Sequence, residues 1–78
     1  MSVVDVELDV RGLRCPMPLM KVSKAIKDMA PGQVIRVTTT DPGSMSDFKG
    51  WTEKTGNPLL EARQEGGLYI YTIKKGQP

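Results

Sequence analysis

The chain has 78 residues, of which 38% are hydrophobic and 26% charged, and its formal net charge is +2. This length and composition predict one globular domain, residues 1–78, in the cytoplasm, with neither a transmembrane span nor a signal peptide. One cysteine and no histidine exclude an internal disulfide, a metal site of clustered cysteines and a nucleophile activated by histidine. The small net charge also argues against nucleic-acid binding.

The first half of the chain predicts strand, helix and strand. Apolar and acidic residues alternate over residues 4–10, which is typical of a half-buried strand. Residues 11–14 form the loop that follows it, and a helix comes next. The apolar side of that helix is expected to consist of Leu19, Val22, Ala25, Ile26 and Met29. Pro31-Gly32 ends the helix, and the β-branched residues of 33–39 predict a second strand.

A second helix is predicted after residue 40. Asp41 is its expected N-cap and Pro42 its first residue, because these residue types favour those positions. Gly56-Asn57 is the expected end. The inner stripe of this helix is predicted to consist of Met45, Phe48, Trp51 and Thr55.

The last part of the chain predicts a β-hairpin, and with it the fold class. Residues 59–65 and 68–74 are expected to be strands, and Gly66-Gly67 is a two-residue turn signal between them. The element order is therefore β-α-β-α-β-β. This order predicts a two-layer α/β sandwich, in which two helices cover one face of a four-stranded mixed sheet.

The single thiol falls where the first loop ends and the first helix begins. Cys15 is the predicted N-cap, where a thiolate accepts hydrogen bonds from helix amides at the positive end of the helix dipole. Pro16 and Pro18 have no N–H, and their rings stiffen the turn. The amides left to the thiolate are mainly those of Met17 and Leu19. These features predict a reactive thiol with a lowered pKa.

Two arginines precede Cys15. The sequence leaves open whether the thiol is reactive or buried, and which reaction a reactive thiol would carry out. Arg11 and Arg14 add positive charge near Cys15, which favours the thiolate further. A lone cysteine is otherwise a small buried hydrophobe, although a junction between Arg14 and a proline is a poor site for core packing. Disulfide exchange lacks a second cysteine in the chain. A redox sensor and a carrier of sulfur as a persulfide both remain possible.

The run LDVRGLRCPMP, residues 8–18, holds an Asp-x-x-Gly-Leu-x-Cys-Pro-x-Pro motif. The matching residues are Asp9, Gly12, Leu13, Cys15, Pro16 and Pro18. Together with residues 31–32, 40–42, 47–48, Trp51 and the closing hairpin, this motif makes the chain resemble the TusA/SirA family of small sulfur-carrier proteins. The resemblance implies the βαβαββ sandwich. It also implies that Cys15 receives sulfane sulfur as a persulfide, as a sulfurtransferase-type carrier rather than a self-sufficient enzyme.

The same resemblance implies protein partners and no metal or organic cofactor. The donor would be a cysteine desulfurase, a rhodanese or a DsrE-like protein, and a downstream protein would accept the sulfur. Both tRNA thiolation and sulfur oxidation or trafficking fit the family, so the pathway stays open.

Other side chains suggest binding surfaces. Lys21 and Lys24, with Arg14, form either a positive strip that steers an acidic partner or an ordinary solvated helix face. Met17 is either an exposed docking contact or part of the first-turn packing. Tyr69 and Tyr71 share one face of the last strand, and they either stack single-stranded RNA bases on an open sheet face or point into the core.

Overall fold

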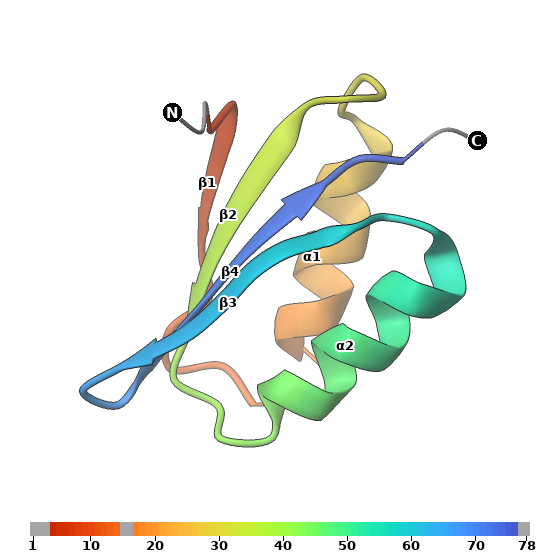
Figure 1. Ribbon diagram of the computed structural model, residues 1–78. Helices are drawn as coiled ribbons and strands as arrows, with labels where there is room; N and C mark the ends of the chain where they lie inside the picture. Colours follow the sequence, from red (N-terminus) through yellow and green to blue (C-terminus); the bar gives the residue numbers. More distant parts are fainter. Residues whose placement is uncertain (1–3, 15–16, 77–78) are drawn as a thin grey trace.

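The structure is a computed structural model, and it describes residues 4–14 and 17–76. Its elements are β1 (Val6–Asp9), α1 (Met17–Lys27), β2 (Val34–Thr39), α2 (Ser44–Thr55), β3 (Leu59–Glu65) and β4 (Leu68–Lys74). The strands form one sheet in the order β1-β2-β4-β3, in which β1 is parallel to β2 and the other pairs are antiparallel. Both helices lie on the same face of the sheet (Figure 1). The predicted two-layer sandwich with a mixed sheet is confirmed.

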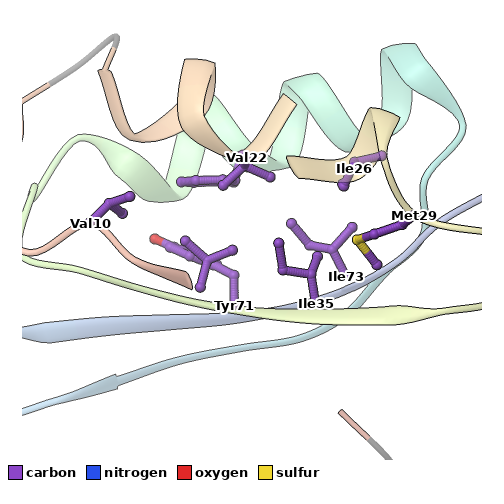
Figure 2. Close-up of a cluster of buried hydrophobic side chains, with 9 residues drawn as sticks. Val10, Val22, Ile26, Met29, Ile35, Tyr71 and Ile73 are labelled. Carbon is purple, nitrogen blue, oxygen red and sulfur yellow. The ribbon is translucent and has the colours of Figure 1, made fainter. Parts of the chain in front are cut away.

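The core lies between the helices and the sheet, because one face of each element is apolar. From the sheet, Ile35 and Ile73 point toward α1, which presents Val22 and Ile26 to them (Figure 2). Leu19 and Ala25 are half-buried against this core, so the predicted apolar side of the first helix is confirmed. Met29 is also buried, but it lies after the end of α1. No helix in the described ranges combines the length and apolar character that crossing a membrane requires.

The start of α2 differs from the prediction. The N-cap is Gly43 and the first helical residue is Ser44, so Asp41 is not the cap and Pro42 is not the first residue. The Asp41 carboxylate instead accepts a hydrogen bond from the Gly43 amide at 3.1 Å, within the turn that precedes the helix. Asp41 therefore shapes the approach to α2 in place of capping it.

The buried side of α2 is also shifted relative to the predicted stripe. The side chains that face the core are Ser44, Phe48 and Thr52. Of the other predicted members, Met45 is 37% exposed, Thr55 is exposed and Trp51 is half-buried. The prediction missed this phase because it assumed that the apolar residue at position 45, rather than the small polar residue before it, faces the sheet.

Ser44 is turned inward because it meets the hydroxyl of a buried tyrosine. Tyr71 is fully buried on β4, and its hydroxyl lies 2.6 Å from Ser44 Oγ. Its ring stacks on Phe48 with a centroid distance of 4.6 Å. Desolvation raises the pKa of Tyr71, although the hydrogen bond with Ser44 opposes the shift. A hydroxyl pair thus joins β4 to the first turn of α2 inside the core.

This placement corrects the idea that Tyr69 and Tyr71 stack bases on the open sheet face. Tyr71 points into the core (Figure 2), and Tyr69 is half-buried against the same core. The open face instead carries the ion pairs of Arg36 with Glu7 and of Arg63 with Glu65. Cations that are paired in this way make a poor surface for phosphates. RNA stacking through these tyrosines is therefore wrong, because side-chain alternation directs both toward the helices.

The hairpin between β3 and β4 is confirmed at the predicted position. Gly66 and Gly67 have φ angles of +48° and +81°, so both residues take the left-handed conformation of a two-residue type I′ turn. α2 ends at Gly56 in a left-handed conformation, as the sequence predicts. The placement of glycines in the sequence therefore predicted both the hairpin turn and the end of α2.

The Tyr71–Ser44 pair gives a test of the core. Tyr71→Phe and Ser44→Ala should each reduce the free energy of unfolding by about 1–3 kcal/mol, because each leaves the other hydroxyl buried without its partner. The double variant should lose less than the sum of the two. Urea unfolding measures all three values. The matched control is Tyr69→Phe, whose hydroxyl has only a 3.5 Å contact with Gln64 at the surface. Strictly additive losses would contradict the pairing.

Candidate functional site

The predicted sulfur acceptor, Cys15, and the neighbouring Pro16 lie outside the described residues. The assignment of Cys15 as the N-cap concerns one of these residues and stays a prediction. The candidate site is therefore built from the residues on either side. The amide of Met17, the first residue of α1, donates to the carbonyl oxygen of Arg14 at 2.8 Å. This hydrogen bond holds the end of the loop and the start of the helix next to each other, on either side of positions 15 and 16.

The loop before the cysteine is fixed to the end of β2. The amide of Val10 donates to the carbonyl oxygen of Thr38 at 2.9 Å, which extends the pairing of β1 with β2 by one residue. The amide of Gly12 donates to the hydroxyl oxygen of Thr40 at 2.9 Å. Gly12 has a φ of +83°, a conformation that residues with a Cβ rarely adopt. The sequence analysis missed Thr40, although a threonine just after a neighbouring parallel strand was a usable signal.

Arg11 is held by an acidic neighbour. Its Nε and one of its terminal amino groups donate to the two carboxylate oxygens of Asp9 at 2.9 and 2.8 Å, and its backbone amide donates to the same carboxylate at 3.0 Å. These hydrogen bonds lower the pKa of Asp9 to about 2. The charge of Arg11 is therefore matched locally, so this residue shapes the loop more than it adds positive potential.

Arg14 is placed differently. It is exposed, and it forms no ion pair with any residue in the described ranges. Of the two arginines that precede Cys15, Arg14 is therefore the one whose charge remains available to an incoming anion.

The outward side of α1 near its start is apolar and basic. Met17 is 42% exposed and Met20 is 58% exposed, so Met17 is not absorbed into first-turn packing. Pro18 is buried in its place. Lys21 and Lys24 are exposed and make no ion pair within residues 4–14 and 17–76. We call the surface of Met17, Met20, Lys21 and Lys24 the α1 surface.

A hollow lies beside the loop that precedes Cys15. It has a volume of about 520 Å³, and it is lined by Gly12, Leu13, Arg14, Thr40, Asp41 and Pro42. The structure therefore brings Arg14 together with the loop before α2, which the sequence analysis did not connect. Within the described ranges, no three His, Cys, Asp or Glu side chains come together as a possible metal site.

Known proteins share both the sequence and the fold. The family model described as sulfurtransferase TusA matches residues 6–75. The chain is 45% identical over 75 residues to a sulfur carrier protein TusA from Allochromatium vinosum, covering 96% of this chain and 99% of that protein. It is 37% identical over 76 residues to the putative sulfur carrier protein YrkF from Bacillus subtilis, covering 97% of this chain but only 41% of that protein.

A solved structure supports the fold independently. A SirA-like protein from Desulfitobacterium hafniense superposes with a TM-score of 0.80, covering 92% of this chain and 99% of that one. Because the sequence identity is 24%, this likeness concerns the architecture alone.

The Asp9–Arg11 contact predicts an acid-shifted titration. Asp9 should titrate with a pKa of about 2 in the folded protein, and Arg11→Gln should return it toward the ordinary value of 3.8. The stabilisation from this depressed pKa is present above pH 3.8 and is lost as the pH falls toward 2, because the unfolded state binds the proton first. Carboxyl-carbon NMR measures the midpoint. The control Arg63→Gln, which breaks the pair with Glu65, should leave it unchanged; a wild-type pKa of 3.8 would refute the contact.

Proposed function

The chain belongs to the TusA sulfurtransferase family, and we propose that it is a sulfur carrier that holds sulfane sulfur as a persulfide on Cys15. The observation that carries this proposal is the family match over residues 6–75, which includes the Cys-Pro-x-Pro motif at residues 15–18. Cys15 is also the only thiol of the chain.

The described residues around Cys15 suit such a carrier. The hydrogen bond between Met17 and Arg14 keeps the positions before and after the thiol close together. Met17 and Arg14 are both exposed, so a partner protein can approach from this side. A carrier needs this combination, because its sulfur must be reached by two different proteins in turn.

The proposed chemistry is two exchange steps on sulfur. The Cys15 thiolate attacks the outer sulfur of a donor persulfide, a new S–S bond forms, and the donor's own S–S bond breaks to release the donor as a thiolate. The acceptor's thiolate then attacks the outer sulfur of the Cys15 persulfide, and Cys15 leaves as a thiolate. Neither step needs an external oxidant or reductant, because one S–S bond replaces another.

Local charges support this chemistry without a histidine. A negative charge at a helix N-terminus gains about 0.3–1 kcal/mol, and one unit of pKa corresponds to about 1.36 kcal/mol. The dipole of α1 alone would therefore lower a thiol pKa by less than about one unit. The unpaired charge of Arg14 acts in the same direction, whereas Arg11 adds less because Asp9 offsets it. Together, the helix dipole and Arg14 are expected to favour the Cys15 thiolate moderately over the neutral thiol.

Partner recognition is proposed to use the α1 surface together with Arg14. Its lysines carry positive charge that no acidic residue in the first turn of α1 offsets. Its methionines offer adaptable apolar contacts, which suits a carrier that meets a donor and an acceptor. The proposed partners are a donor such as a cysteine desulfurase, a rhodanese or a DsrE-like protein, and a downstream acceptor protein. A free thiol fits the reducing cytoplasm, and tRNA thiolation and sulfur oxidation or trafficking remain the two candidate pathways.

Sulfur loading tests the proposed function directly. After incubation with a cysteine desulfurase and cysteine, or with a small persulfide, the protein should gain the mass of one sulfur atom. The gain should disappear in Cys15→Ser and on treatment with a reductant, because both remove the persulfide. Intact-mass spectrometry measures it. Met45→Leu is the matched control, since it removes an exposed sulfur atom on α2, outside the α1 surface, but no thiol. No gain from any of these donors would reject the carrier function.

Charge reversal on the α1 surface tests partner recognition. The double variant Lys21→Glu and Lys24→Glu should slow loading by the desulfurase about ten-fold or more at low salt, because steered association depends on such charges. The difference should shrink as salt rises. Stopped-flow loading rates measure this. The control pair Lys49→Glu and Lys54→Glu makes the same change in net charge on α2; an equal slowing by the control would show that only net charge matters.

A further inference from the structure

Thr40 connects two loops that are far apart in the chain. It follows β2 directly, and its hydroxyl oxygen accepts the hydrogen bond from the Gly12 amide at 2.9 Å, across a sequence separation of 28 residues. Gly12 lies three positions before Cys15. The side chain of Thr40 is exposed and lies outside the apolar core. Its contact therefore concerns the loop and adds little to core packing.

This hydrogen bond differs from the others that the loop makes. Arg11 bonds to Asp9, two residues earlier, and Leu13 bonds to Val10. The carbonyl oxygen of Arg14 accepts a hydrogen bond from the amide of Met17. Among the hydrogen bonds that residues 11–14 make with other described residues, the bond to Thr40 is the one that reaches a distant part of the chain. It therefore ties the loop to the end of β2 by a polar contact, beside the packing of the half-buried Leu13 against the core.

The acceptor is itself held firmly in place. The amide of Asp41, the next residue, donates to Thr39 Oγ1 at 3.1 Å, and Thr39 is fully buried. The carbonyl of Asp41 accepts from the amide of Ser44, whose hydroxyl pairs with Tyr71 in the core. Thr40 thus lies between two anchored neighbours. Because its neighbours are tied to the core, the Thr40 hydroxyl is a fixed acceptor for the Gly12 amide.

We propose that Thr40 is a positioning residue for sulfur transfer. Its hydroxyl holds the Gly12 turn, and through it the segment up to Arg14, the residue that directly precedes Cys15 in the sequence. This inference rests on the proposed carrier function. Gly12 needs such a hold, because its left-handed φ of +83° turns the chain from the strand toward the helix.

The test replaces the hydroxyl without changing the shape. In Thr40→Val the Gly12 amide loses its acceptor, and alkylation of Cys15 by iodoacetamide should slow about two- to ten-fold at neutral pH, the range expected for one hydrogen bond. The midpoint of its pH–rate profile should move toward about 8.5, the value of an unperturbed thiol. Thr40→Ser keeps the hydroxyl and should restore both the rate and the midpoint.

The control is Thr55→Val, at the far end of α2. It removes an exposed hydroxyl with two hydrogen bonds of its own, to Trp51 and Asn57, so it reports general loosening of the fold. It should leave the Cys15 profile unchanged. If Thr40→Val does not fold, as judged by circular dichroism, Thr40→Ala takes its place in the same comparison.

The outcomes separate this inference from the carrier function. An unchanged rate and midpoint in Thr40→Val, or an equal change in Thr55→Val, would overturn the role of Thr40 whether or not the protein carries sulfur. Failure of the wild-type protein to take up sulfur, with a normal response of alkylation to Thr40, would reject the carrier function and leave a positioned thiol of another use. Loss of sulfur loading in Thr40→Val with rescue by Thr40→Ser supports both.

Discussion

The parallel pairing of β1 with β2 is the constraint on which the candidate site depends. Parallel strands bring their carboxyl ends to the same edge of a sheet, so the loops that follow β1 and β2 must meet there. The first loop leads to Cys15 and α1, and the second leads to Asp41 and α2. The contact of Gly12 with Thr40 is the direct result of that meeting. An antiparallel arrangement of the same two strands would place the loops at opposite ends of the molecule.

The elements could be predicted because each one carries a complete local signal. Alternation over β1 and β2, the apolar side of α1 and the Gly66-Gly67 turn all specify structure within a few residues. The start of α2 could not be predicted in this way. Asp41 is a good capping residue by type, but α2 begins at Ser44, whose side chain turns inward to meet Tyr71, 27 residues away. Local propensity gives way to tertiary contacts at such positions.

The features of the candidate site likewise divide into those that local sequence predicts and those that depend on tertiary contacts. The position of Cys15 in the sequence, the motif around it and the exposure of Lys21 and Lys24 all follow from local pattern. The different behaviour of the two arginines does not, because it depends on side-chain geometry: Arg11 turns back to Asp9, whereas Arg14 stays unpaired among the described residues. A count of positive charges near the thiol therefore overstated the potential that acts on it. Thr40 was missed because its partner lies 28 residues away, although its place directly after the strand that pairs with β1 was a usable signal.

A carrier with a single thiol must satisfy two demands that pull apart. The sulfur must be accessible to two proteins, yet the segment that bears it must keep a defined position. In a chain of this size the core is small. Packing anchors the flanks in part, because Leu13 is half-buried against the core and Pro18 is buried. Hydrogen bonds anchor the flanks as well: Gly12 to Thr40 before the segment, and Met17 to Arg14 across it. Polar contacts at the surface thus add to what packing provides, and the buried Tyr71–Ser44 pair extends that support into the core.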